Sequence, residues 1–274
     1  MKDYPATPQE MVASFWRNHS LIYTLSKREV IGRYRGSFLG IVWSFITPLL
    51  MLVVYTFVFS LIFKARWTPQ SDSKTEFALV LFAGLLVFNL FSECITKAPT
   101  LILSNVNYVK KVVFPLEILP WVTLYSALFH GVVSLVVWLI GYGVFFEAPH
   151  LTIFYLPLII LPFCLMIMGF SWVLASLGAY LRDIGQMIGI AVTAMMFLSP
   201  VFYPINTLPD KYQYLLMINP LTIPVEQTRD FLFWGIAADV NLGLLIIYWL
   251  VSLVIACSGF FWFQKTRKGF ADVL

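Results

Sequence analysis

A sudden change from basic to uncharged sequence near residue 37 constrains this chain more than any other feature. Four lysine and arginine residues crowd into residues 27 to 35, and no charged residue occurs from Ser37 to Phe63. A helix that crosses the hydrocarbon layer of a membrane needs about 20 apolar residues, and basic side chains stay on the cytoplasmic side. The pattern therefore predicts a transmembrane helix that is preceded by a cytoplasmic N-terminal segment.

The composition places the whole chain in a membrane. Of its 274 residues, 60% are hydrophobic and only 12% are charged, whereas about a quarter of the residues in a soluble domain are charged. The net charge of +4 lies in short loops and tails beside apolar runs, so it indicates topology signals and lipid contacts rather than a nucleic-acid surface. Cys94, Cys164 and Cys257 stand alone in apolar sequence and are predicted to be buried thiols.

Six apolar runs predict an all-α integral membrane protein with both termini in the cytoplasm. In this layout the inner segments hold thirteen basic residues and the outer segments hold five, which agrees with the positive-inside rule. The predicted spans are residues 37–63, 77–96, 120–146, 151–180, 184–203 and 240–263.

The predicted spans divide the chain into a cytoplasmic arm (1–36), a transmembrane domain (37–263) and a cytoplasmic tail (264–274). In the arm, apolar residues recur at helical spacing from about Gln9 onward. We expect an amphipathic helix that lies in the headgroup layer, and docking of the same helix to a partner protein is compatible with this position. The apolar residues are Met11, Phe15, Leu21, Ile22 and Leu25.

The sequence also predicts local contacts for several residues in or near the first three spans. Glycines at 32, 36 and 40 form a small-residue stripe that predicts close helix packing. Glu93 and Lys97 lie four residues apart and are expected to pair across one helical turn. His130 lies alone in the third span, and we expect a neutral imidazole that bonds to a neighbouring helix.

The link between spans 2 and 3, residues 98–119, is predicted to be cytoplasmic. Pro99 and Pro115 bracket a stretch that is able to form a short amphipathic helix with Lys110 and Lys111 on its polar side. A helix fixed between two spans could transmit a push to the membrane domain. A helix lying on the lipid surface with a basic edge explains the same pattern.

Residues 204–239, between spans 5 and 6, alternate polar turns with apolar patches. The patches at 215–218 and 231–238 are too short to cross a bilayer. Short apolar helices at membrane depth are tolerated where protein or a water-filled cavity satisfies their backbone. We therefore predict a pair of re-entrant or interfacial helices on the outer side.

The sequence lacks the motifs of an enzyme or a self-driven pump. It contains no GxxxxGK[ST] phosphate loop, HExxH, GxSxG or CxxC. The three histidines fall on different sides of the predicted membrane, so no metal site is expected. The spans also lack the acidic and basic rows of ion-coupled carriers, so the driving energy is expected from another chain.

Aromatic residues form the remaining pattern. Tyr55, Phe59 and Phe63 recur every fourth residue in the first span, with Trp43 and Tyr34 toward its inner end. Most aromatic residues in such a chain serve as lipid-facing core and interfacial belt. This row could also stack on sugar rings without gripping them, so we predict that these five residues line the path of a polymer.

Four motifs in the same order resemble the transmembrane subunit of ATP-binding-cassette polysaccharide exporters, which export O-antigen, capsule or teichoic acid. The motifs are RYRGSFLGIVWSFITPL at 33–49, NVNYVKKVVFPLEILP at 105–120, LSPVFYP at 198–204 and NPLTIPVEQTRD at 219–230. The resemblance implies a homodimer that encloses a channel in the bacterial cytoplasmic (inner) membrane. Two copies of a separate nucleotide-binding subunit would bind ATP and magnesium, and this chain would hold no cofactor of its own.

The resemblance also implies a substrate and a coupling site. The substrate would be an undecaprenyl-linked polysaccharide, with O-antigen the first choice. Residues 100–113 would form the coupling helix that sits in a cleft of the ATPase, and the short outer helices would narrow the exit. We assign ATPase coupling to Asn105, Tyr108, Lys110 and Lys111 as a hypothesis.

Two alternatives remain open from sequence. The first is a permease of the same superfamily that exports a drug or a lipid. The second is a membrane-embedded enzyme that acts on lipid-linked sugars, such as a polymerase or an acyltransferase. That enzyme would need a catalytic acid, base or nucleophile near a membrane face, and the scattered histidines and acidic residues argue against it.

Overall fold

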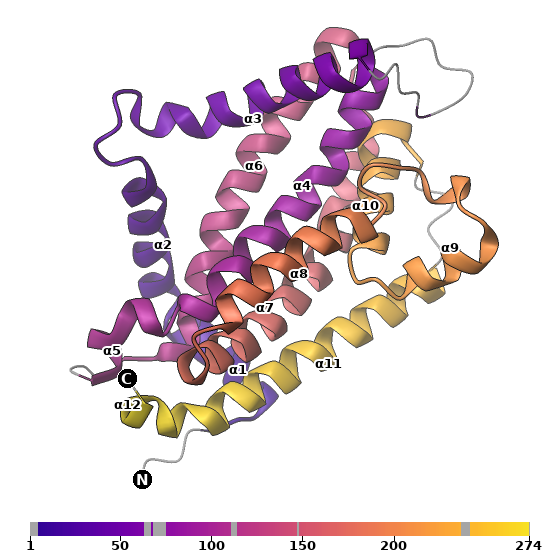
Figure 1. Ribbon diagram of the computed structural model, residues 1–274. Coiled ribbons are helices and arrows are strands. Elements are labelled where there is room, and N and C mark those ends of the chain that lie inside the picture. Colours follow the sequence, from indigo (N-terminus) through magenta and orange to yellow (C-terminus); the bar gives the residue numbers. More distant parts are fainter. Residues whose placement is uncertain are drawn as a thin grey trace.

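A computed structural model describes residues 5–62, 67, 75–110, 114–146, 148–236 and 242–273. The described residues form helices and connecting turns, with no strand among them (Figure 1). Five helices in this part of the chain are long and apolar enough to cross a membrane, and a shorter apolar helix, α8, covers Ile184–Leu198. The long ones are Gly40–Phe59, Glu76–Thr100, Leu116–Phe145, Leu151–Tyr180 and Leu242–Gly269.

The helix boundaries follow the predicted spans closely, and short 3₁₀ or π turns extend several helices. The remaining α-helices are α1 (Pro8–Arg17), α2 (His19–Tyr34), α3 (Trp43–Tyr55), α4 (Glu76–Lys97), α5 (Val106–Lys110), α6 (Leu119–Phe145), α7 (Leu156–Tyr180), α9 (Asp210–Met217), α10 (Thr222–Arg229), α11 (Leu242–Thr266) and α12 (Phe270–Val273). The 3₁₀ turns are η1 (Gly40–Val42), η3 (Ala98–Thr100), η4 (Leu103–Asn105), η5 (Leu116–Ile118), η6 (Leu151–Tyr155), η7 (Ile205–Thr207) and η9 (Arg267–Gly269), and the π-helices are η2 (Thr56–Ile62) and η8 (Asp230–Trp234).

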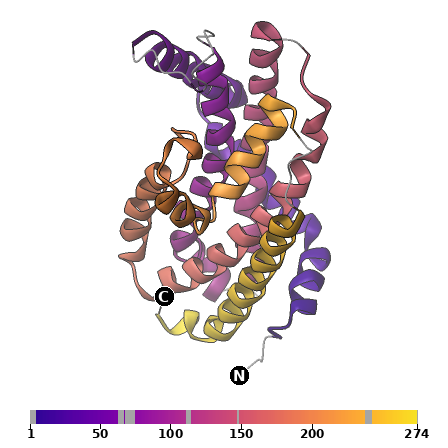
Figure 2. The ribbon, with the colours of Figure 1, turned by 90° about the vertical axis from the view of Figure 1, so that its right-hand side faces the viewer.

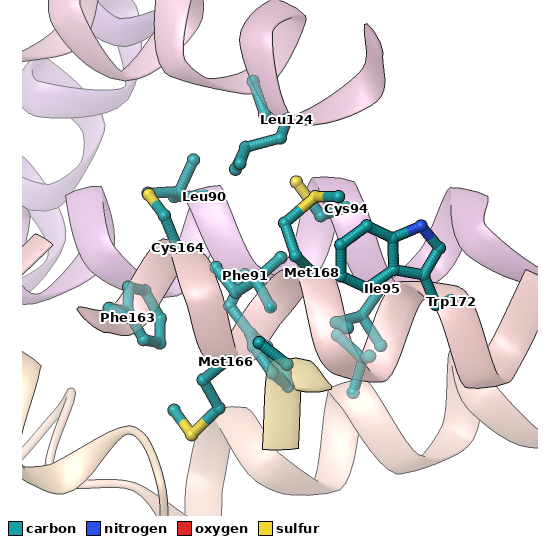
Figure 3. Close-up of a cluster of buried hydrophobic side chains, with 14 of the residues drawn as sticks. Leu90, Phe91, Cys94, Ile95, Leu124, Phe163, Cys164, Met166, Met168 and Trp172 are labelled. Atoms are coloured by element: carbon teal, nitrogen blue, oxygen red, sulfur yellow. The ribbon is translucent and has the colours of Figure 1, made fainter. Parts of the chain in front are cut away.

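Helix α4 forms the centre of the bundle, since most of its side chains are buried. Its face at residues 90–95 packs against α7, and Leu124 of α6 closes the cluster (Figure 3). The thiols of Cys94 and Cys164 lie in this cluster, and Cys257 is half-buried. The prediction of buried thiols is therefore confirmed for Cys94 and Cys164.

Helices α7 and α11 approach so closely that their glycines touch backbone. A Cβ atom added to Gly169 would lie 2.4 Å from the carbonyl oxygen of Ile255, and one added to Gly259 would lie 2.2 Å from that of Gly169. At the end of α7, a Cβ on Gly178 would lie 2.0 Å from the carbonyl oxygen of Pro99. Only glycine allows backbones of helices to come this close.

Helices α1, α5 and α12 lie at one end of the molecule, whereas the C-terminal ends of α3 and α6 lie at the other (Figures 1 and 2). The arm is helical as predicted, with a break at Asn18 between α1 and α2, and its position in the headgroup layer stays a prediction. Ile22 and Leu25 of α2 are buried against Ile118 and Val122 at the beginning of α6. The apolar face of the arm therefore packs on protein.

The predicted glycine stripe is wrong. Gly36 and Gly40 have positive φ angles of 87° and 54° and lie in the bend between α2 and α3. No heavy atom of the described residues comes within 4 Å of a Cβ added to Gly32, Gly36 or Gly40. Gly36 and Gly40 adopt a backbone conformation that L-residues rarely adopt. The first span consequently begins near Gly40, later than predicted.

Candidate functional site

A cavity of about 530 Å³ lies between the bend of α2 and α3 on one side and α4 with α6 on the other. Polar side chains reach its lining from all four helices. They are Arg33 and Tyr34 from α2, Ser44, Thr47 and Tyr55 from α3, Asn89, Ser92 and Glu93 from α4, and His130 and Ser134 from α6.

A charged cluster closes one wall of this cavity. The Glu93 carboxylate accepts hydrogen bonds from Arg33 and from Lys97 Nζ at 3.1 Å. Its second oxygen lies 3.1 Å from His130 Nδ1, and Lys97 also pairs with Glu29 at 2.8 Å. The cluster therefore ties α2, α4 and α6 together.

The cluster confirms two predictions and extends them. Glu93 and Lys97 pair as expected, and His130 does bond to a neighbouring helix. Sequence reasoning missed that Glu93 is the partner of His130, because the two residues lie 37 positions apart. It also missed Arg33, whose guanidinium reaches the same carboxylate from the arm.

Other polar side chains of the lining, on the same two helices as Glu93 and His130, are neutral. The side chains of Asn89, Ser92 and Ser134 make no hydrogen bond within the described ranges. Asn89 is exposed on α4, although that helix is one of the five candidate spans. A polar side chain at such a position favours contact with water or a polar ligand rather than with lipid.

Four of the five residues of the predicted polymer path are described, and the rings of Tyr55 and Phe59 lie 6.5 Å apart. Tyr34 and Tyr55 line the cavity, whereas Trp43 is exposed outside the lining. Phe59 stacks on Phe77 and Phe202, with ring centroids 5.2 and 6.3 Å away, since the π-helix η2 changes the register after Tyr55. Phe63 lies outside the described residues.

The predicted coupling residues lie on the link that follows α4. Asn105 ends the turn η4, and Tyr108 and Lys110 belong to α5, whereas Lys111 lies outside the described residues. The Tyr108 hydroxyl accepts a hydrogen bond of 3.1 Å from Arg28 of α2, and its ring stacks on Phe114 at 4.3 Å. The arm therefore holds the link in place, and the Lys110 side chain is exposed.

A buried ion pair joins the remaining segments at this end. Arg267 Nη1 donates to Glu117 Oε2 at 2.6 Å, and Ser14 of α1 donates to the other carboxylate oxygen at 2.8 Å. The Trp172 indole donates to the carbonyl of Glu117 at 2.9 Å. The arm, the link, α7 and the tail thus meet at one carboxylate that sequence patterns did not single out.

The buried guanidinium of Arg229 links the region of the two short helices α9 and α10 to α4 and to the turn after α8. Arg229 of α10 donates to the carbonyl oxygens of Pro200 and Val201 at 2.5 Å each, and to that of Val80 at 3.1 Å. Glu226 pairs with it at 2.9 Å. Short helices were predicted in residues 204–239, and α9, α10 and η8 confirm them as far as residue 234. Their re-entrant or interfacial position stays a prediction.

These features define a multi-pass helical membrane protein with a polar cavity in its bundle and a braced helical link at the end that carries the termini. The chain belongs to the ABC-2 type transporter family, whose model matches residues 20–233. It is therefore a transport permease rather than an enzyme, and the resemblance noted from sequence motifs is confirmed.

Characterised relatives match along almost the whole chain. The O-antigen export system permease protein RfbA of Klebsiella pneumoniae is 24% identical over 93% of this chain and 95% of its own length. The polysialic acid transport protein KpsM of Escherichia coli is 26% identical over 86% and 91% of the two chains. The capsule polysaccharide export inner-membrane protein CtrC of Neisseria meningitidis is 27% identical over 93% and 96%.

Proposed function

We propose that this chain is the permease of an ATP-driven exporter that carries a lipid-linked polysaccharide, with O-antigen the first choice, across the bacterial cytoplasmic membrane. The observation that carries the proposal is the end-to-end similarity to permeases of O-antigen and capsule export. The sequence has no phosphate loop. We therefore assign ATP and magnesium to a separate nucleotide-binding subunit, two copies of which would serve a homodimer of this chain.

The proposed topology has six crossings with both termini in the cytoplasm. Five crossings would put the arm and the tail on opposite sides of the membrane, and the position of α1 and α12 at the same end of the molecule supports an even number instead (Figure 1). Helix α8 supplies the sixth crossing, although its 15 residues span only about 22 Å at the helical rise. In this arrangement α9 and α10 lie on the outer side, where they would narrow the exit of the channel.

Complementation of a strain that lacks its own exporter permease tests the proposal. Expressed with its ATPase, the chain should restore polysaccharide on the cell surface, whereas cells without it should accumulate the polymer inside. Restored efflux of small amphiphiles in place of polysaccharide would favour a drug or lipid exporter. Polymer that changes in chain length or acylation without crossing the membrane would favour a membrane-embedded enzyme.

The link at residues 98–119 is proposed to couple the membrane domain to the ATPase. Its α5 carries Lys110 on the exposed side and is braced by Arg28 from the arm. Reversing both charges, Lys110→Glu with Lys111→Glu, is expected to abolish co-purification of the ATPase and to reduce export at least tenfold. Lys265→Glu, on the tail, serves as the control for net charge. Wild-type assembly in the double variant would exclude this coupling role.

The aromatic residues are proposed to contact the moving polymer. Tyr34 and Tyr55 are the strongest candidates for contact with the polymer because both line the polar cavity. Replacing both with alanine is expected to reduce surface polysaccharide severalfold while the ATPase stays bound. Tyr125→Ala, on α6 outside the cavity lining, is the matched control. Equal export by the double alanine variant and by Tyr125→Ala would mean that Tyr34 and Tyr55 do not contact the polymer.

A further inference from the structure

The C-terminal tail packs against the link that is proposed to couple the membrane domain to the ATPase. Arg267, in the turn η9 after α11, donates from Nη1 to Glu117 Oε2 and from Nη2 to the carbonyl oxygen of Phe114, both at 2.6 Å. The side chains of Arg267 and Glu117 are only 9% and 7% exposed. One buried guanidinium therefore joins the tail to two points of the link.

Contacts with α7 hold the tail on both sides of Arg267. Phe270 of α12 is fully buried, and its ring centroid lies 5.8 Å from that of Tyr180 and 5.5 Å from that of Phe263. The Tyr180 hydroxyl donates to the carbonyl oxygen of Thr266 at 2.7 Å. The guanidinium therefore meets the link from a backbone that is itself anchored.

The two partners of Arg267 belong to different parts of the link. The ring of Phe114 stacks on Tyr108 of α5, with the centroids 4.3 Å apart. Glu117 lies in the turn η5, which leads directly into α6, and its carboxylate also accepts from Ser14 of α1. The contacts therefore run without interruption from α5, through the guanidinium, to the beginning of α6.

A buried ion pair of this kind contributes orientation more than stability. Taking two charges out of water offsets most of their attraction, so well-packed apolar side chains of similar volume often stabilise a protein equally well. A guanidinium differs from them because its rigid, planar fork fixes the directions of its acceptors. Arg267 therefore holds Phe114 and Glu117 in one mutual orientation, and a displacement of one is passed to the other.

We infer that Arg267 and Glu117 are positioning residues for energy coupling, which transmit a movement of α5 to α6 and α7. The carbonyl oxygen of Glu117 reaches α7 by accepting from the Trp172 indole at 2.9 Å, and α6 carries His130 and Ser134 of the polar cavity. The inference deepens the proposed function and rests on it for the role of the ATPase and for the exported glycan.

Two readouts on the reconstituted complex of the chain and its ATPase test the inference. The first is the amount of polysaccharide translocated per ATP hydrolysed. The second needs no cargo, since it compares how fast a water-soluble maleimide labels Asn89→Cys in the polar cavity with and without ATP. The half-buried Cys257 is replaced by serine in this background. We expect ATP to change the labelling rate severalfold when Arg267 is present.

Arg267→Met removes the charge and the fork. We expect ATPase binding and ATP hydrolysis to stay close to wild type, translocation per ATP to fall about fivefold or more, and the response of labelling to ATP to disappear. Lys265→Met removes an exposed charge from the same end of the chain and should leave both readouts unchanged. Arg267→Lys keeps the charge without the fork and should be intermediate.

Double variants show whether the contacts act in series. Phe114→Leu removes the stacked ring and keeps the carbonyl oxygen, and Glu117→Gln removes the carboxylate charge. Each should lower translocation per ATP by itself and lower it no further in combination with Arg267→Met, because residues that act as a unit are not additive. Glu117→Gln alone, with the same two readouts, decides the matter if Arg267→Met does not assemble.

An unchanged value of either readout in the assembled Arg267→Met complex would overturn the inference. Translocation that falls only in proportion to assembly would do the same, since it marks a purely structural role, and so would wild-type labelling that does not respond to ATP. A complex that responds to ATP and loses this response in Arg267→Met, but moves no polysaccharide, would contradict the proposed function alone. Polysaccharide transport with an unchanged ratio to ATP in Arg267→Met would contradict the role of Arg267 alone.

Discussion

Replacing Gly169 with leucine is expected to prevent the chain from accumulating as a folded protein. A Cβ atom at this position would lie 2.4 Å from the Ile255 carbonyl oxygen and 2.8 Å from the Ala256 amide nitrogen. Both are backbone atoms, so no side-chain rotation relieves the overlap, and α7 and α11 would have to separate. Overpacking a core usually lowers the free energy of unfolding by about 1–3 kcal/mol. We expect a loss at or above the upper end of this range, because the overlap is with backbone atoms.

The yield of monodisperse protein and its unfolding temperature in detergent measure this effect. Gly143→Leu is the matched control, since its Cβ meets no heavy atom within 4 Å in the described structure. Gly169→Ala is expected to be intermediate. Equal stability of Gly169→Leu and Gly143→Leu would mean that α7 and α11 do not cross as closely as described.

Replacing Arg229 with methionine is expected to release the outer helices from the bundle. The buried guanidinium satisfies three backbone carbonyls, including the pair at Pro200 and Val201 that ends the turn after α8. Leaving buried acceptors unpaired costs about 1–3 kcal/mol each, and breaking a buried ion pair costs about 3–5 kcal/mol. Loss of export and faster proteolysis within residues 204–236 should follow together.

Three further variants separate the role of Arg229 in holding the outer helices from a general effect of losing a charge. Arg17→Met removes an exposed pair with Glu10 and should cost less than about 1 kcal/mol. Glu226→Gln keeps the carbonyl bonds of Arg229 and should cost less than Arg229→Met. Gly84→Ala should resemble Arg229→Met in milder form, because its Cβ would lie 2.5 Å from Arg229 Nη2. Wild-type resistance of Arg229→Met to proteolysis would mean that Arg229 does not hold the outer helices against the bundle.

Much of the helical layout was predictable because apolar length determines it. The boundaries of α4, α6 and α7 fall within a few residues of the predicted spans. The beginning of the first span was misplaced because the spacing of Gly36 and Gly40 is compatible both with a helical repeat and with two positive-φ positions in a bend. Periodicity alone does not separate these two uses of glycine.

The site was predictable only in part. Local spacing was sufficient for the Glu93 and Lys97 pair, since both belong to one helical turn. The partners from other helices, Arg33 and His130, depend on how α2 and α6 pack against α4, and no spacing rule reports that packing. In the aromatic row, the rings of Tyr55 and Phe59 remain 6.5 Å apart, and Phe59, which lies in the π-helix η2, also stacks on Phe77 and Phe202. The contact of this row with a polymer stays a prediction.

Reconstitution in proteoliposomes tests the central claim most directly. The chain is reconstituted with its ATPase subunit, and translocation of lipid-linked polysaccharide is followed by its accessibility to a glycosidase on the far side. The account predicts ATP-dependent translocation that requires both subunits and stops when the ATPase is inactivated. Translocation by this chain unaided, or by the ATPase in liposomes without it, would contradict the account.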